Sequence, residues 1–85
     1  MGELVANKGT FILNNTNEFT GVIDAIVVLQ DTVFNAVKIA GTDVKSDYIA
    51  TPATAVKAGA MITPKSDLQF SGVDLTSGSV ALVLG

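Results

Sequence analysis

Residues 21–39 read GVIDAIVVLQDTVFNAVKI, the densest run of apolar and β-branched residues in the chain. Apolar residues recur at helical spacing in this stretch, but five of the seven residues from Val22 to Val28 are β-branched. Such side chains lose rotamer freedom in a helix and pack well on a pleated sheet. The stretch therefore predicts two strands, Ile23–Leu29 and Val33–Ile39, rather than a helix.

The polar triplet Gln30-Asp31-Thr32 separates these two segments and predicts a short turn. Two apolar runs joined by so short a polar link are typical of a β-hairpin, so we expect the two strands to pair antiparallel. The first of them is nearly all apolar, which is typical of a strand that is buried on both faces.

The rest of the chain predicts further short strands joined by turns. Residues 50–60, rich in Ala and Thr with one Pro, predict an irregular connection between two sheets. The expected strands are Thr10–Leu13, a short strand around Tyr48, Ala60–Pro64, Leu68–Leu75 with Gly72 as a bulge or bend, and Ser79–Leu84. Six to eight short strands predict an all-β fold, a small antiparallel β-sandwich or barrel that is jelly-roll-like. The predicted core residues are Ile26, Val28, Val33, Phe34, Phe70, Leu75, Val80 and Leu82.

Length and composition predict one small domain with more apolar surface than its interior can hide. Residues 10–85 are expected to form a single β domain, and residues 1–9 a flexible N-terminal arm that ends in the turn signal Asn7-Lys8-Gly9. A chain of 85 residues buries only roughly 60% of the surface of its unfolded form. Yet 48% of the residues are hydrophobic, and the mean hydropathy is +0.50. Some apolar surface should therefore lie in a subunit interface or on a larger partner.

The chain lacks the residues that several classes of function need. The chain has no His, Cys, Trp or Arg, and its five Lys residues are scattered singly, with a formal net charge of −3. Catalytic triads, zinc sites and most proton shuttles use His or Cys, so we expect no enzyme activity, no metal and no cofactor. Nucleic-acid binding needs clustered cations, and the longest apolar run, Ala25–Leu29, is too short to span a bilayer. We therefore expect neither a nucleic-acid nor a membrane partner.

Two pairs of carboxylates are candidate sites. Asp24 and Asp31 lie close together in the expected hairpin, where a glycosidase-like pair is conceivable. Asp43 and Asp47 are separated by Val44-Lys45-Ser46, a sparse match to a calcium loop. In both cases the turn preference of Asp favours solvated structural residues over a site.

Two blocks of sequence carry a family resemblance. The first is AIVVLQDTVF at residues 25–34; the second begins at residues 59–62, passes Phe70 and ends in VDLTSGSV at residues 73–80. They resemble the strand pair I-x-V-L-x-D-T-V-F and the closing L-T-S-G-x-V segment of small virion proteins of tailed bacteriophages. The resemblance covers roughly residues 18–84, and its motifs are structural rather than catalytic. The segment 50–58 and the N-terminal arm do not match the pattern.

The resemblance implies a capsid decoration, or cement, protein. Such a protein is made in the host cytoplasm, sits on the outside of the virion, binds the major capsid protein and is commonly a homotrimer. Leu4 and Val5 in the arm are the candidate capsid contacts, because they are apolar but continue no core period. Two alternatives remain: a tail, head-fibre or baseplate component, and a small ligand-binding β-barrel or cupin-like enzyme.

Overall fold

A computed structural model describes residues 9–65 and 67–85 of the chain. These residues form seven strands and one short helix, and every pairing between the strands is antiparallel. In chain order the elements are β1 (Thr10–Leu13), β2 (Phe19–Val28), β3 (Val33–Ile39), β4 (Thr42–Asp43), α1 (Lys45–Tyr48), β5 (Met61–Ile62), β6 (Phe70–Ser77) and β7 (Val80–Leu84). The expected small antiparallel all-β fold is confirmed.

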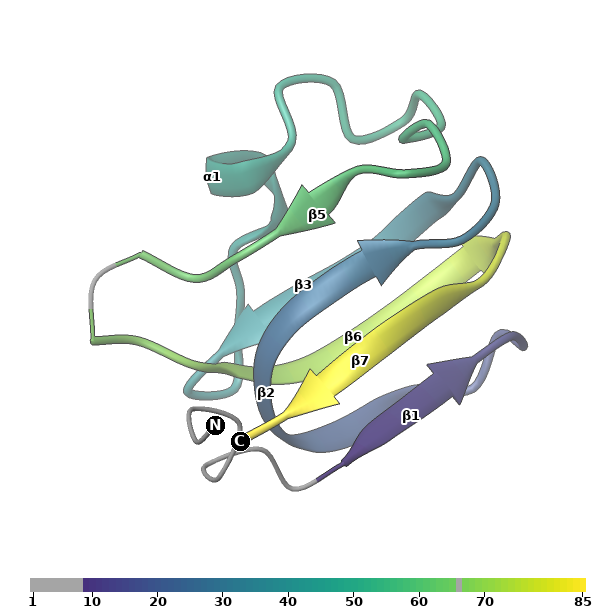
Figure 1. Cartoon of the computed structure of the whole chain (residues 1–85). Coiled ribbons are helices and arrows are strands. Elements are labelled where there is room, and N and C mark those ends of the chain that lie inside the picture. Colours follow the sequence, from purple (N-terminus) through teal and green to yellow (C-terminus); the bar gives the residue numbers. More distant parts are fainter. Residues whose placement is uncertain (1–8, 66) are drawn as a thin grey trace.

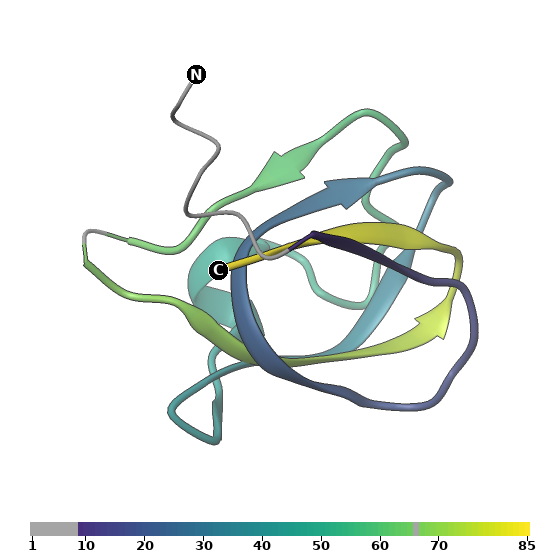
Figure 2. The ribbon, with the colours of Figure 1, turned by 60° about the horizontal axis from the view of Figure 1, so that its bottom comes forward.

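The seven strands form one hydrogen-bonded sheet, which bends at the long strand β2 into two halves that we call the first sheet and the second sheet. The first half of β2 pairs with β6, and its second half lies between β7 and β5. The register shifts between Thr20 and Ile23 on the β6 side and between Ile23 and Ala25 on the β7 side, and such irregularities bend a strand. The first sheet therefore runs β1-β7-β2-β5 and the second β2-β6-β3-β4, with the two sheets curving around a common interior (Figures 1 and 2).

The core lies between the two sheets and is made of inward-facing residues of both. It contains Leu13, Ile23, Ile26, Val28, Phe34, Val37, Ile62, Phe70, Val73, Leu75, Val80 and Leu82. Seven of the eight predicted core residues are buried, but the prediction for Val33 was wrong. Val33 is only half-buried, because it starts β3 at the rim of the sheet, opposite the exposed Ser77.

The expected hairpin of β2 with β3 was also wrong, although both strands exist. β6 lies between them in the sheet order, and the link from β2 to β3 crosses from the first sheet to the second. The N–H groups of Leu29 and Gln30 donate to the carbonyl of Ser79 at 3.0 and 3.4 Å. Thr32 is fully buried, with its hydroxyl 2.7 Å from the carbonyl oxygen of Gln30. The polar triplet is thus a crossover rather than a hairpin turn, with Thr32 buried and Gln30 and Asp31 exposed.

A one-turn helix, α1, stands where a strand around Tyr48 was expected. Asp43 favours it, because Oδ1 accepts the N–H of Lys45 at 3.0 Å and that of Val37 at 3.3 Å. Nζ of Lys45 lies 2.8 Å from Oδ2 of the same carboxylate. The Tyr48 ring packs edge-on against Phe70, with 5.1 Å between the ring centroids. The aromatic residue that suggested a strand covers the core from a helix instead.

Two expectations about individual strands need correction. β2 is not buried on both faces: Ile26 and Val28 point into the core, whereas Ala25 and Val27 are half-buried on the outside. Gly72 is aligned regularly with Thr20 and Lys38, so the bulge lies in β2 after Thr20 rather than at Gly72.

The connection through residues 50–60 is irregular, as expected, and it is attached to the crossover. Thr32 and Val56 exchange two backbone hydrogen bonds, of 2.9 and 2.7 Å. The carboxylate of Asp31 accepts the N–H of Ala58 at 3.1 Å and lies 3.2 Å from Nζ of Lys57. These bonds hold the connection against the end of β2.

Acidification is expected to weaken these carboxylate contacts. The N–H of Ala58 and the ammonium group of Lys57 lower the pKa of Asp31 below its ordinary value of 3.8. For Asp43, partial burial raises the pKa, but the hydrogen bonds from Lys45 and Val37 outweigh burial and lower it overall. Both carboxylates therefore bind protons more readily in the unfolded chain than in the folded one. Their contribution to the free energy of unfolding is complete above about pH 4 and is lost as the pH falls through the folded-state pKa values.

Urea titrations at several pH values between 7 and 2 measure this effect. Asp31→Asn should make the free energy of unfolding less dependent on pH below about 4, and an unchanged dependence would contradict the role given to Asp31.

Candidate interaction surface

The outer face of the first sheet is formed almost wholly by apolar side chains. Residues directly opposite each other on neighbouring strands share a face, so the register defines this surface. One row runs Ile12, Ala81, Val27 and Met61 across four strands, and a second runs Thr10, Val83 and Ala25 across three. We call these seven residues the apolar sheet face. Thr10 is its only member with a polar side chain.

Both ends of the longer row are well exposed. The side chain of Met61 on β5 is 64% exposed, and that of Ile12 on β1 is 47% exposed. Between them Ala81 is buried, with 9% exposure, and Val27 is half-buried, which leaves the middle of the row lower than its ends. Such a surface offers apolar contact area without a charged group that a partner would have to desolvate.

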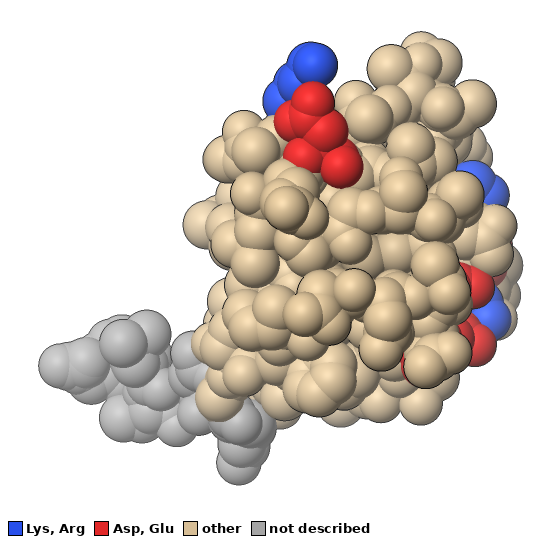
Figure 3. Space-filling view, turned by 90° about the vertical axis from the view of Figure 1, so that its right-hand side faces the viewer, with Lys and Arg blue, Asp and Glu red and all other residues tan. Residues whose placement is uncertain are grey.

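Charged residues are rare in the strands of the first sheet. β1, β5 and β7 contain none, and β2 contains only Asp24, which lies where the strand bends. Figure 3 views the molecule from the end where the links after β2 and β6 lie, and charged side chains appear there only toward the edges of the view. Among the described residues, every charged side chain except that of Asp24 belongs to a segment outside the strands of the first sheet.

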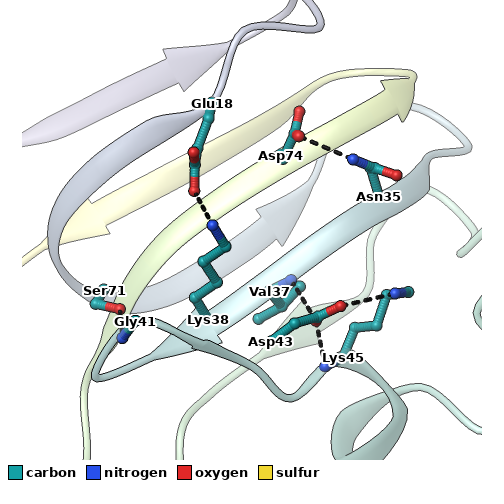
Figure 4. A network of polar contacts seen from close by, with 9 residues as sticks. All are labelled: Glu18, Asn35, Val37, Lys38, Gly41, Asp43, Lys45, Ser71 and Asp74. Atoms are coloured by element: carbon teal, nitrogen blue, oxygen red, sulfur yellow. Dashed lines mark hydrogen bonds and ion pairs between the residues drawn. The ribbon is translucent and has the colours of Figure 1, made fainter.

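The outer face of the second sheet is polar by contrast (Figure 4). Nζ of Lys38 on β3 lies 2.8 Å from Oε2 of Glu18, and the carboxylate of Glu18 raises the pKa of Lys38. Nδ2 of Asn35 donates to Oδ2 of Asp74 on β6 at 2.9 Å. Such exposed pairs add little stability, but they keep this face hydrated. The two outer faces of the molecule therefore differ sharply in polarity.

The candidate carboxylate pair Asp24 and Asp31 does not form a site, because the two side chains have different partners. Asp24 lies within β2, and its Oδ1 accepts a hydrogen bond from Nε2 of Gln69 at 2.6 Å. Asp31 lies after the end of β2, where it contacts Lys57 and Ala58. Asp43 supports α1 as described above. Within residues 9–65 and 67–85, no group of three or more acidic, His or Cys side chains could hold a metal ion.

The described part of the chain has no pocket. No helix within it is long and apolar enough to cross a membrane. Leu4 and Val5, the capsid contacts suggested by the sequence, lie outside the described residues.

The apolar sheet face was only partly visible in the sequence. The apolar surplus predicted an interface somewhere, and the runs AIVV and VALVL are apolar on both sides of their strands. Comparisons of the chain with models of protein families, with curated proteins and with solved structures found no match.

Proposed function

We propose that this protein is a capsid decoration, or cement, protein of a tailed bacteriophage, which binds the outside of the head and stabilises its shell. The observation that carries the proposal is the contrast between the two outer faces. The apolar sheet face suits contact with another protein, and the Lys38–Glu18 and Asn35–Asp74 pairs suit contact with water. A decoration protein needs one surface of each kind. The sequence motifs at residues 25–34 and 73–80 support the same assignment.

The proposed partner is the major capsid protein, engaged by a homo-oligomer. The motif resemblance implies a trimer, and several subunits that bind one shell together multiply a modest energy per contact. Because no charged side chain belongs to the apolar sheet face, binding should depend only weakly on salt. Leu4 and Val5 remain proposed additional contacts.

A lysine on the apolar sheet face should weaken shell binding by about tenfold or more. Met61→Lys tests this, because the side chain is 64% exposed and the fold tolerates a charge there, whereas a bound partner would have to desolvate it. Thr20→Lys is the matched control, since Thr20 is an exposed strand residue on the polar face beside Gly72. Co-sedimentation with purified heads of the source phage measures both affinities.

The outcomes separate the proposal from its alternatives. Wild-type protein that saturates the heads, with Thr20→Lys like wild type and Met61→Lys weakened, supports decoration through this face. If the two variants bind the heads equally well, the apolar sheet face does not take part in the contact. Wild-type protein that binds purified tails and ignores heads would show a tail, fibre or baseplate component instead.

A further inference from the structure

The strand β1 forms an unprotected edge of the first sheet. It pairs with β7 on one side, and among the described residues no strand lies on its other side (Figure 1). The four residues of β1 include no charge, proline or glycine. Natural edge strands usually carry lysine, proline or a bulge, which prevents pairing with other chains. This edge lacks all three.

The other two sheet margins are protected. β4 has two residues, and its Asp43 is engaged by Lys45 and by the N–H of Val37. β5 also has two residues, and Pro64 follows it closely. Among the sheet margins in residues 9–65 and 67–85, β1 is the one without such protection, so it is the margin suited to pairing with another strand.

The backbone groups that face outward from β1 follow from its register. The N–H of Leu84 donates to the carbonyl of Gly9 at 2.9 Å, and Thr10 is the next residue, opposite Val83. Hydrogen-bonded pairs alternate along an antiparallel ladder, so Phe11 and Leu13 bond to β7 as Gly9 does. The N–H and C=O groups of Thr10 and Ile12 therefore point away from β7.

We propose that β1 strands of two copies of this chain pair antiparallel about a two-fold axis at Phe11. Thr10 of each copy then lies opposite Ile12 of the other, and the two pairs exchange four backbone hydrogen bonds. Phe11 of one copy lies beside Phe11 of the other. The two first sheets join into one sheet of eight strands, and the two apolar sheet faces become continuous.

Three observations favour a second copy as the occupant of this edge. Thr10 and Ile12, whose backbone groups point away from β7, lie on either side of Phe11. Two β1 strands can therefore pair antiparallel with Phe11 opposite Phe11. Neither β1 nor β7 carries a charge, so copies with a net charge of −3 meet here without close repulsion. Phe11 is 44% exposed while its ring stacks on Phe19 at 4.8 Å, so a second Phe11 would extend an existing aromatic contact.

The pairing does not depend on the proposed shell binding. It is a contact between two copies, and it is compatible with a trimer built through other surfaces. Four residues a side bury less than the roughly 1,200 Å² typical of stable complexes, so the association should depend on concentration.

Engineered disulfides test the register directly, because the chain has no cysteine. Residues opposite each other at a non-hydrogen-bonded position have Cα atoms about 4.5 Å apart, within disulfide range, so Phe11→Cys should cross-link on mild oxidation. In the same pairing the two Thr10 residues are offset by two positions, about 8 Å apart, which is too far. Oxidised Phe11→Cys should therefore run as a dimer of the 8.7-kDa chain, while Thr10→Cys stays largely uncross-linked. Circular dichroism of the reduced variants controls for folding.

A second variant removes the contact without a cysteine. Ile12→Pro deletes an N–H that points away from β7, so the ladder within the chain is kept while two hydrogen bonds of the pair are lost. Sedimentation equilibrium should show association for wild type and for the control Ile12→Val, but much weaker association for Ile12→Pro. The proposal is overturned if folded Phe11→Cys remains monomeric on oxidation, if Thr10→Cys cross-links equally fast, or if Ile12→Pro associates like wild type. If reduced Phe11→Cys does not fold, the comparison of Ile12→Pro with Ile12→Val in sedimentation equilibrium is the deciding test.

Discussion

Replacing Phe34 by alanine is expected to lower the free energy of unfolding by about 3–5 kcal/mol. Phe34 is 2% exposed and faces the core from β3, opposite the buried Leu75 on β6. The substitution removes the transfer energy of the ring and leaves a cavity between two sheets whose strands cannot easily close it. In a domain whose total stability is about 5–15 kcal/mol, the loss would leave a substantial unfolded fraction or a greatly lowered melting temperature.

Urea and thermal unfolding of Phe34→Ala, compared with Leu29→Ala, measure this loss. Leu29 follows β2 and is 45% exposed, so its truncation should cost far less. Similar midpoints for Phe34→Ala and wild type would mean that β3 presents the opposite face to the core.

A methyl group at Gly78 should also be strongly destabilising, by about 2–5 kcal/mol. Gly78 has φ = +96°, a conformation that side chains other than that of glycine rarely adopt. It also lies against the crossover between β2 and β3. A Cβ atom there would be 2.6 Å from Cα of Thr32 and 2.7 Å from the carbonyl oxygen of Asp31. Backbone atoms on both sides would have to move apart.

Gly41→Ala separates the two causes of that cost. Gly41 has φ = +82°, but a Cβ atom added there would meet nothing within 4 Å. Gly41→Ala should therefore show the backbone strain alone, about 1–2 kcal/mol. If both alanine variants lose the same stability in chemical denaturation, the close packing of Gly78 on Thr32 is not what holds the crossover.

Local alternation predicted which residues face the core but not which strands meet. Val80 and Leu82 were correctly predicted as buried because their alternation with smaller residues is visible within one strand. The partner of β2 was predicted wrongly because strand pairing depends on contacts far apart in sequence. Nothing within residues 30–32 indicates that Thr32 is buried against the carbonyl of Ser79, 47 residues away.

The helix α1 shows the same limit on a smaller scale. A weak alternation of polar and apolar residues over residues 45–49 suggested a strand, whereas the carboxylate of Asp43 accepts the N–H groups of Lys45 and Val37 and thereby favours a turn of helix. A bond from one side chain to two segments is not visible as a period in the sequence.

The sequence predicted that an apolar interaction surface exists, but it did not predict where on the fold that surface lies. An apolar surplus in a short chain predicts an interface, and the apolar runs in β2 and β7 mark the strands that contribute to it. The run in β2 suggested a strand covered on two sides, and the run in β7 a strand with larger residues on one face and smaller ones on the other. Placing the uncovered side required the register that aligns Ala81 with Ile12 and Val27. The edge of β1 likewise became apparent only from the sheet order.

A cryo-electron microscopy map of the phage particle would show whether the apolar sheet face binds the outside of the head. We expect density for this fold on the outer surface of the shell, with β1, β7, β2 and β5 turned toward neighbouring protein and the Lys38–Glu18 pair toward solvent. A map that places the protein in the tail, or on the head with the apolar sheet face open to solvent, would rule out this mode of binding.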